Sequence, residues 1–109
     1  MLEKLKQNIK INQEGKTTGA EKYVFQLYIV GNSISSARAI KNITAICEHY
    51  LKNRFTLEII DITENPTLAN VEDIIAVPLL IRKFPLPKEK IVGDLSDTQK
   101  VLDALNIVK

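Results

Sequence analysis

The hydrophobic and polar residues of the chain fall into blocks that predict strands and helices in alternation. Residues 23–30 (YVFQLYIV) are β-branched and aromatic with one polar residue among them, which is typical of a central strand. Apolar residues then recur at spacings of three and four, which predicts a helix that begins at a serine within residues 33–36 and ends near Asn53. The core face expected for this helix consists of Ala37, Ile40, Ile43, Cys47 and Leu51.

The middle of the chain predicts a second strand and a short helix. Apolar and polar residues alternate at the start of residues 55–62, so this segment is expected to form a strand. Asn65-Pro66 ends the strand. Because proline suits the first turn of a helix, a short helix is expected over residues 66–72.

Two further strands are expected in the second half of the chain. Residues 74–82 are apolar up to the last position, but Pro78 in their middle lacks the N–H that a sheet ladder needs. The third strand is therefore expected to begin at Pro78. A turn at Pro85-Leu86-Pro87 then leads to a short strand over residues 90–92, which Gly93-Asp94 ends.

The chain closes with a predicted helix, for which Ser96 and Gln99 form a candidate capping box. The expected core face of this helix consists of Val101, Leu102, Leu105 and Val108. The order strand, helix, strand, helix, strand, strand, helix is the thioredoxin-like topology, an α/β fold. We expect a central mixed four-stranded sheet with three helices over residues 23–109. This fold places a cis-proline at the head of its third strand, so the Val77-Pro78 bond is expected to be cis.

The whole net excess of positive charge lies in the first 22 residues. The chain has 15 Lys and Arg against 13 Asp and Glu, and the first 22 residues hold five lysines and three glutamates. This segment is polar and punctuated by Gly15 and Gly19, so residues 1–22 are expected to form a flexible N-terminal arm. The remaining ten basic and ten acidic residues leave the folded part near neutral. A near-neutral domain does not favour nucleic-acid binding, which needs a broad basic surface.

The residues at the start of the first predicted helix argue against redox chemistry. A thioredoxin-like enzyme needs a thiolate there, because the helix dipole and free N–H groups lower the pKa of the thiol. Residues 31–36 (GNSISS) offer only serines, and serine hydroxyls cannot exchange two electrons. A glutathione enzyme of this fold would need a second helical domain, for which 109 residues leave no room. We therefore expect neither catalytic residues nor a cofactor.

The single cysteine and the single histidine also favour structural roles. Cys47 lies on the apolar face of its helix and is expected to be an inert core thiol. His49 falls on the polar side of the same helix, so the two residues point to different faces and do not form a metal site. One cysteine, no secretory signal and no long apolar run predict a cytoplasmic protein without a membrane span.

Several short motifs, taken in order, resemble the KaiB family. They are residues 27–32 (LYIVGN), 37–41 (ARAIK), 60–62 (IDI), 65–69 (NPTLA), 76–80 (AVPLL) and 91–96 (IVGDLS). The resemblance implies a small non-enzymatic clock or clock-derived protein that binds the ring-shaped ATPase KaiC, with a histidine kinase as a further partner. It also implies a fold that can switch to a second, often tetrameric state with a rebuilt C-terminal half, so a homo-oligomer is an open expectation.

The resemblance suggests two groups of site residues. The partner-binding residues implied by basic positions of the family are Arg38, Lys41, Arg82 and Lys90. The fold-switch positions are Val77, Pro78, Gly93, Asp94, Ala104 and Asn106. For Gly93 and Asp94 an ordinary turn is the alternative role. For the four basic residues the alternative is that they are ordinary solvated charges on the surface.

The residues at 104–106 bear on the balance between the two states. Cyanobacterial members of the family carry Gly-Leu-Asp where this chain has Ala104-Leu105-Asn106. Glycine inside a helix costs about 0.8–1.0 kcal/mol relative to alanine, and an acidic residue near a helix C-terminus is disfavoured by the dipole. Both replacements strengthen the last helix. We therefore expect the protein to rest mainly in the thioredoxin-like state.

Other positions depart from the family. Glu58, Asp73 and Glu89 stand where cyanobacterial members are often basic, so part of the KaiC-facing charge is inverted. Together with the long N-terminal arm, this inversion allows a clock-derived regulator with a different or retuned partner. Two other functions stay open beside the clock regulator. One is a stress-response adaptor or kinase-sensing module that uses the same fold without rhythm, and the other is a thiol or glutathione enzyme.

Overall fold

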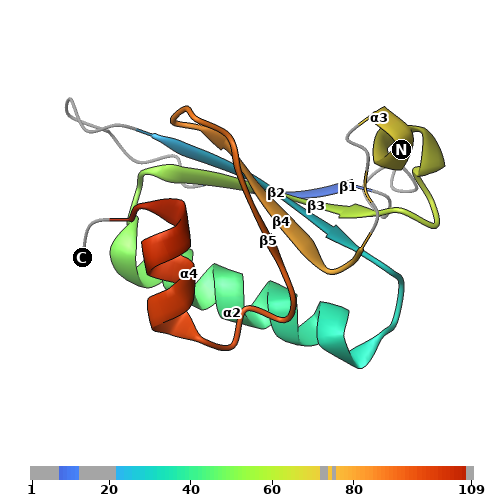
Figure 1. The fold of residues 1–109 in the computed structure, drawn as a ribbon, viewed down its shortest axis with the longest axis horizontal. Helices are drawn as coiled ribbons and strands as arrows, with labels where there is room; N and C mark the ends of the chain where they lie inside the picture. Colours follow the sequence, from blue (N-terminus) through green and yellow to red (C-terminus); the bar gives the residue numbers. More distant parts are fainter. Residues whose placement is uncertain (1–7, 13–21, 72–73, 75, 108–109) are drawn as a thin grey trace.

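The computed structural model describes residues 8–12, 22–71, 74 and 76–107 (Figure 1). In these residues the elements in chain order are β1 (Asn8–Asn12), β2 (Tyr23–Ile29), α2 (Ile34–Tyr50), β3 (Phe55–Asp61), α3 (Pro66–Val71), β4 (Leu79–Phe84), β5 (Glu89–Val92) and α4 (Thr98–Leu105). The predicted succession from the first central strand to the last helix is confirmed. The Val77-Pro78 peptide bond is cis, as expected, and so are the bonds before Pro85 and Pro87.

The sheet has five strands in the order β1-β3-β2-β4-β5. β2 and β3 are parallel and every other neighbouring pair is antiparallel, which makes the sheet mixed as predicted. The fifth strand is a correction, because residues 8–12 lie in the segment expected to be a flexible arm. Their sequence alternates polar and apolar residues, and they pair with the edge of β3, whose backbone groups would otherwise lack partners. The other residues of that arm up to Glu21 lie outside the described part of the chain.

The main core lies between the sheet and the two long helices, α2 and α4, which cover one face (Figure 1). Side chains of β2 and β3 alternate along the strands, and Phe25, Leu27 and Leu57 are buried on the helical side. The other face carries a smaller cluster of Tyr28, Ile60, Leu79 and Ile81. Two faces with separate apolar clusters explain why the central strands are rich in apolar residues throughout.

The face that α2 buries differs slightly from the expected one. Ala37 is exposed, while the buried residues of the helix are Ser36, Ala39, Ile43, Ile46 and Cys47. The spacing of three and four residues is retained, so the period was correct but the first turn was misplaced. The helix begins after the N-cap Ser33, whose hydroxyl accepts a hydrogen bond from the Ser36 N–H.

The start of α4 also corrects a prediction. Its N-cap is Asp97, whose carboxylate accepts from the Lys100 N–H at 3.1 Å, and not Ser96. The third residue after this N-cap is Lys100 and not Gln99, so the expected capping box of Ser96 and Gln99 does not form. The physical reason is the turn that precedes the helix. The Ser96 N–H donates to the Asp94 carboxylate in a tight turn, so the helix begins after that turn.

The end of α4 has the geometry that its sequence favours. Asn106 follows the helix with a φ of 60°, a left-handed conformation that asparagine tolerates better than most residues. Its N–H and that of Ile107 donate to carbonyls of the last turn. Ala104 is exposed within the helix. Val108, expected on the core face, lies outside the described residues, whereas Ile107 is buried without having been predicted.

Candidate functional site

The N-terminus of α2 is the place where a redox enzyme of this fold would hold its thiols. Here Ser36 is 1% exposed, and its hydroxyl accepts a hydrogen bond from the Val30 N–H at 3.1 Å. The Ser33 hydroxyl accepts from the Ser36 N–H at 3.1 Å. Both side chains therefore satisfy backbone donors at the junction of β2 and α2. Both serine hydroxyls therefore have a structural role, as hydrogen-bond acceptors for the backbone.

Asp61 anchors the same end of the sheet. Its carboxylate accepts from the Gly31 N–H at 3.1 Å and from the Thr63 N–H and hydroxyl at 3.0 and 2.6 Å. Partial burial raises the pKa of the Asp61 carboxyl, but the hydrogen bonds from Thr63 and Gly31 outweigh it and leave the pKa below its ordinary value. The carboxylate therefore stays charged at neutral pH and ties the ends of β2 and β3 together.

Cys47 is buried in the main core, as expected. Burial, with a smaller contribution from the charge of Glu48, raises the pKa of the Cys47 thiol far above its ordinary value. The thiolate is the reactive form of cysteine, so this shift disfavours reaction at neutral pH. The predicted core position of Cys47 is confirmed, and its inertness stays a prediction.

Within the described ranges, no group of three or more His, Cys, Asp or Glu side chains is placed to hold a metal ion. None of the helices in the described part of the chain combines the length and the apolar character needed to cross a membrane.

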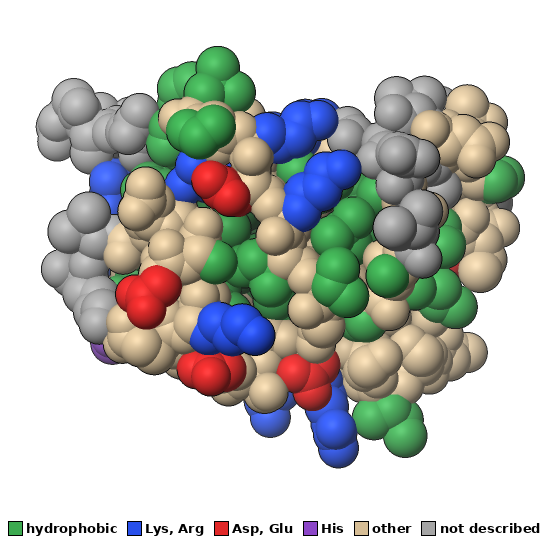
Figure 2. All heavy atoms as spheres, viewed as in Figure 1, with side chains coloured by type: hydrophobic (Ala, Val, Ile, Leu, Met, Phe, Trp, Pro, Cys, Tyr) green, Lys and Arg blue, Asp and Glu red, His purple; other side chains and the backbone are tan. Residues whose placement is uncertain are grey.

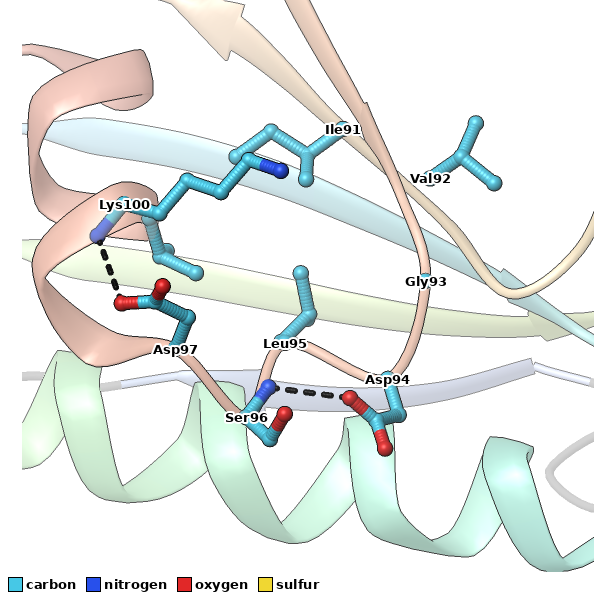
Figure 3. A pocket seen from close by; sticks show the side chains of 9 residues that line it. Ile91, Val92, Gly93, Asp94, Leu95, Ser96, Asp97 and Lys100 are labelled. Carbon is cyan, nitrogen blue, oxygen red and sulfur yellow. Dashed lines mark hydrogen bonds between the residues drawn. The ribbon is translucent and has the colours of Figure 1, made fainter.

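A surface hollow lies between β5 and α4 (Figure 3). Ile91, Leu95 and Val101 form its apolar lining, and the Lys100 side chain extends along it toward Ile91. Its volume of about 150 Å³ is well below the roughly 300 Å³ at which small-molecule pockets begin. The hollow is thus too small to enclose a nucleotide or a comparable cofactor.

Four of the predicted switch positions lie together at one end of the β4–β5 hairpin. The Gly93 N–H donates to the Pro78 carbonyl at 2.9 Å, and Gly93 has a φ of 126°. The carbonyl of the next residue, Asp94, accepts from the Asn42 side chain of α2 at 2.8 Å. Val77, before Pro78, packs against the smaller apolar cluster. These residues form one connected turn region.

The two remaining switch positions, Ala104 and Asn106, lie at the opposite end of α4. The Asn106 carbonyl accepts from the Tyr23 hydroxyl at 3.4 Å, which links the helix end to β2. The structure therefore separates the predicted switch positions into a turn region before α4 and a cap region after it. A role for any of them in switching stays a prediction.

The predicted partner-binding residues do not gather into one patch. Arg38 and Lys41 are exposed and three residues apart, so they share a face of α2. Lys90 is exposed on β5 and alternates with Ile91, which packs on the helical side, so Lys90 faces the other way. Figure 2 shows basic and acidic side chains interspersed over the face that carries β5 and α4.

Arg82 is the clear departure from the expected surface site. Only 2% of it is exposed, and its guanidinium donates to the carbonyls of Leu105 and Pro87. In this fold its charge is not presented to a partner. Alternation along β4 could have revealed this, because Arg82 lies two residues after Leu80 and so shares the core-facing side of the strand.

A family model described as the KaiB domain matches residues 26–107. Similar proteins include the circadian clock protein KaiB3 of Synechocystis sp., which is 47% identical over 85 residues that cover 78% of this chain and 83% of the relative. The circadian clock oscillator protein KaiB of Synechococcus elongatus is 41% identical over 86 residues, which cover 79% and 84%.

Solved structures with a similar fold include two thioredoxins and the N-terminal domain of SasA. Deadhead thioredoxin from Drosophila melanogaster has a TM-score of 0.64 and 10% identity, covering 79% of this chain and 80% of the other. Mitochondrial thioredoxin 3 from Saccharomyces cerevisiae has a TM-score of 0.64 and 14% identity, covering 80% of each chain. The N-terminal domain of Synechococcus elongatus SasA has a TM-score of 0.58 and 22% identity, covering 84% and 90%. These likenesses show a thioredoxin-like fold, and the domain match together with the identities to KaiB proteins shows that the chain belongs to the KaiB family.

Proposed function

We propose that this protein is a non-enzymatic cytoplasmic regulator that binds a KaiC-type ring ATPase and modulates its signalling, in a circadian clock or a system derived from one. The observation that carries the proposal is the KaiB domain match over residues 26–107, which contains both long helices, β3, β4 and β5 in full, and β2 from Gln26 onward. Relatives that are 41% and 47% identical are named as circadian clock proteins. We infer the same kind of role for this chain.

The start of α2 supports binding in place of catalysis. Ser33 and Ser36 use their hydroxyls to accept backbone N–H groups, at the position where thiols would serve a redox enzyme. The buried thiol of Cys47 cannot replace them, because its raised pKa keeps it protonated. The chemistry of these side chains favours a function exerted through protein contacts.

The proposed contact surface is the exposed face of α2 that carries Arg38 and Lys41. Exposed charges of one sign speed the encounter with a surface of opposite sign and weaken with added salt. We place an acidic surface of the ATPase against this face. Lys90 lies on the other side of the sheet and would make a separate contact, and Arg82 is left out of the surface because it is buried.

Reversing the charge at Arg38 or Lys41 is expected to weaken binding to the cognate ATPase. For Arg38→Glu and for Lys41→Glu we expect the Kd to rise by about tenfold each, mainly through slower association, since a rim charge affects association most. The measurement is a fluorescence anisotropy titration of labelled protein with the ring ATPase at two salt concentrations.

The matched control is Lys52→Glu, which makes the same change of net charge at an exposed residue beyond the end of α2. It is expected to leave the Kd within about twofold of the wild-type value, as solvated surface charges usually contribute little. An equal loss in all three variants would assign the effect to net charge alone, and no loss in the α2 variants would exclude this face as the contact surface.

A further inference from the structure

Arg82 is the largest fully buried side chain of the described residues and lies on an interior strand of the sheet, next to the edge strand β5. It belongs to β4, where it faces Phe25 of β2 on one side and Glu89 of β5 on the other. Its side chain extends from the helical face of the sheet to the last residue of α4. A charged group is thus placed under a helix where an apolar residue would ordinarily lie.

Neutral acceptors hold this charge. One terminal nitrogen donates to the Leu105 carbonyl at the end of α4, and the other donates to the Pro87 carbonyl in the β4–β5 turn at 2.7 Å. The Nε atom is buried and has no hydrogen-bond partner among the described residues. Glu89, directly opposite in the strand pair, makes no ion pair with Arg82 in this part of the chain.

The position of the Leu105 carbonyl strengthens its bond to the guanidinium. Carbonyls in the last turn of a helix lack partners within the helix and carry the negative end of its dipole. A buried guanidinium that loses such an acceptor keeps an uncompensated charge in an apolar surrounding, which is strongly unfavourable. The charge of Arg82 is therefore satisfied only while α4 is docked on the sheet and the turn is in place.

We propose that Arg82 is a latch that couples the docking of α4 to the conformation of the β4–β5 turn. Its two acceptors belong to elements that share no backbone hydrogen bond in the described structure, and the guanidinium is a polar link between them. Releasing α4 removes the Leu105 carbonyl, and loosening the turn removes the Pro87 carbonyl, so either change leaves the guanidinium with one of its two acceptors. The inference rests on the contacts of the isolated protein and does not depend on ATPase binding.

The test is native-state hydrogen exchange of the full chain by NMR, without any ATPase. Arg82→Met keeps an unbranched apolar stem but removes the guanidinium and both of its bonds. We expect amides in the second half of α4 to exchange at least tenfold faster in this variant, while those of β2 and β3 change by less than threefold. Lys83→Met, one position along and on the other face of β4, is the control and is expected to leave α4 unchanged.

A double-mutant cycle tests the coupling to the turn. Pro87→Gly loosens the turn by adding backbone freedom, and we expect it to speed exchange in α4 when Arg82 is present but to add little in the Arg82→Met background. Equal effects in both backgrounds would overturn the latch.

Two other outcomes would also overturn the latch. A uniform rise in the amide exchange rates of all elements would show that Arg82 acts only on global stability. Unchanged exchange rates in α4 would show that the bonds of Arg82 do not hold the helix. If Arg82→Met does not fold, the same exchange measurement is made on Arg82→Lys. Lysine keeps the charge with one donor group, and we expect a smaller rise that is still confined to α4.

Discussion

Truncating Leu105 to alanine is expected to lower the free energy of unfolding by about 2–5 kcal/mol, the range for large-to-small changes in a packed core. Leu105 is fully buried in the main core and is the last residue of α4. The substitution keeps the backbone carbonyl that accepts from Arg82, so it tests the apolar contacts of the helix alone. Domains of this kind have about 5–15 kcal/mol of total stability, so the loss would be large.

Urea unfolding followed by far-UV circular dichroism measures this effect. Lys100→Ala changes an exposed residue of the same helix and is expected to alter the free energy of unfolding by less than about 0.5 kcal/mol. A loss below about 1 kcal/mol for Leu105→Ala would mean that α4 is not packed on the sheet in solution. Such a result would favour another arrangement of the C-terminal segment.

Replacing Gly93 with alanine is expected to cost about 1–3 kcal/mol, the usual range for a residue held in a sparsely populated backbone conformation. Gly93 has a φ of 126°, and a Cβ added there would meet no atom within 4 Å. The cost therefore comes from the backbone and not from a steric clash. The change is measured by urea unfolding of the two proteins under the same conditions.

The chirality of alanine supplies a matched control at Gly93. A chain of 109 residues is accessible to chemical ligation, and D-alanine adopts positive φ as readily as L-alanine adopts negative φ. D-alanine at position 93 is expected to retain the wild-type stability or exceed it slightly, because it restricts the unfolded chain. Equal losses for the two forms would contradict the backbone explanation and point to a contact that the turn makes in solution.

Local signals were sufficient to predict most of the fold. The β-branched run at residues 23–30 and the spacing of three and four in α2 each identify an element without long-range information. Pro78 marked the head of β4 because proline cannot donate within a ladder. β1 escaped prediction because its five residues lie in a polar, glycine-containing segment, and their pairing depends on the free edge of β3 far along the chain.

The candidate site was harder to predict than the fold. The exposure of Arg38 and Lys41 follows from helical periodicity, which the spacing of apolar residues along the sequence reveals well. Arg82 was misplaced because a charged residue is exposed by default, and its burial depends on carbonyls of Pro87 and Leu105 that the folded structure brings together. Asp97 replaced Ser96 as the N-cap because both residue types cap helices equally well, and only the turn at Asp94 decides between them.

Direct binding of the unmodified protein to its cognate KaiC-type ring ATPase tests the proposed function most directly. The measurement is size-exclusion chromatography with light scattering, on mixtures prepared with ADP and with ATP at micromolar concentrations. The proposal predicts that the protein elutes with the ring, with the mass of a complex, in at least one nucleotide state. Separate elution in both states would contradict it and would favour an adaptor that uses the same fold for another partner.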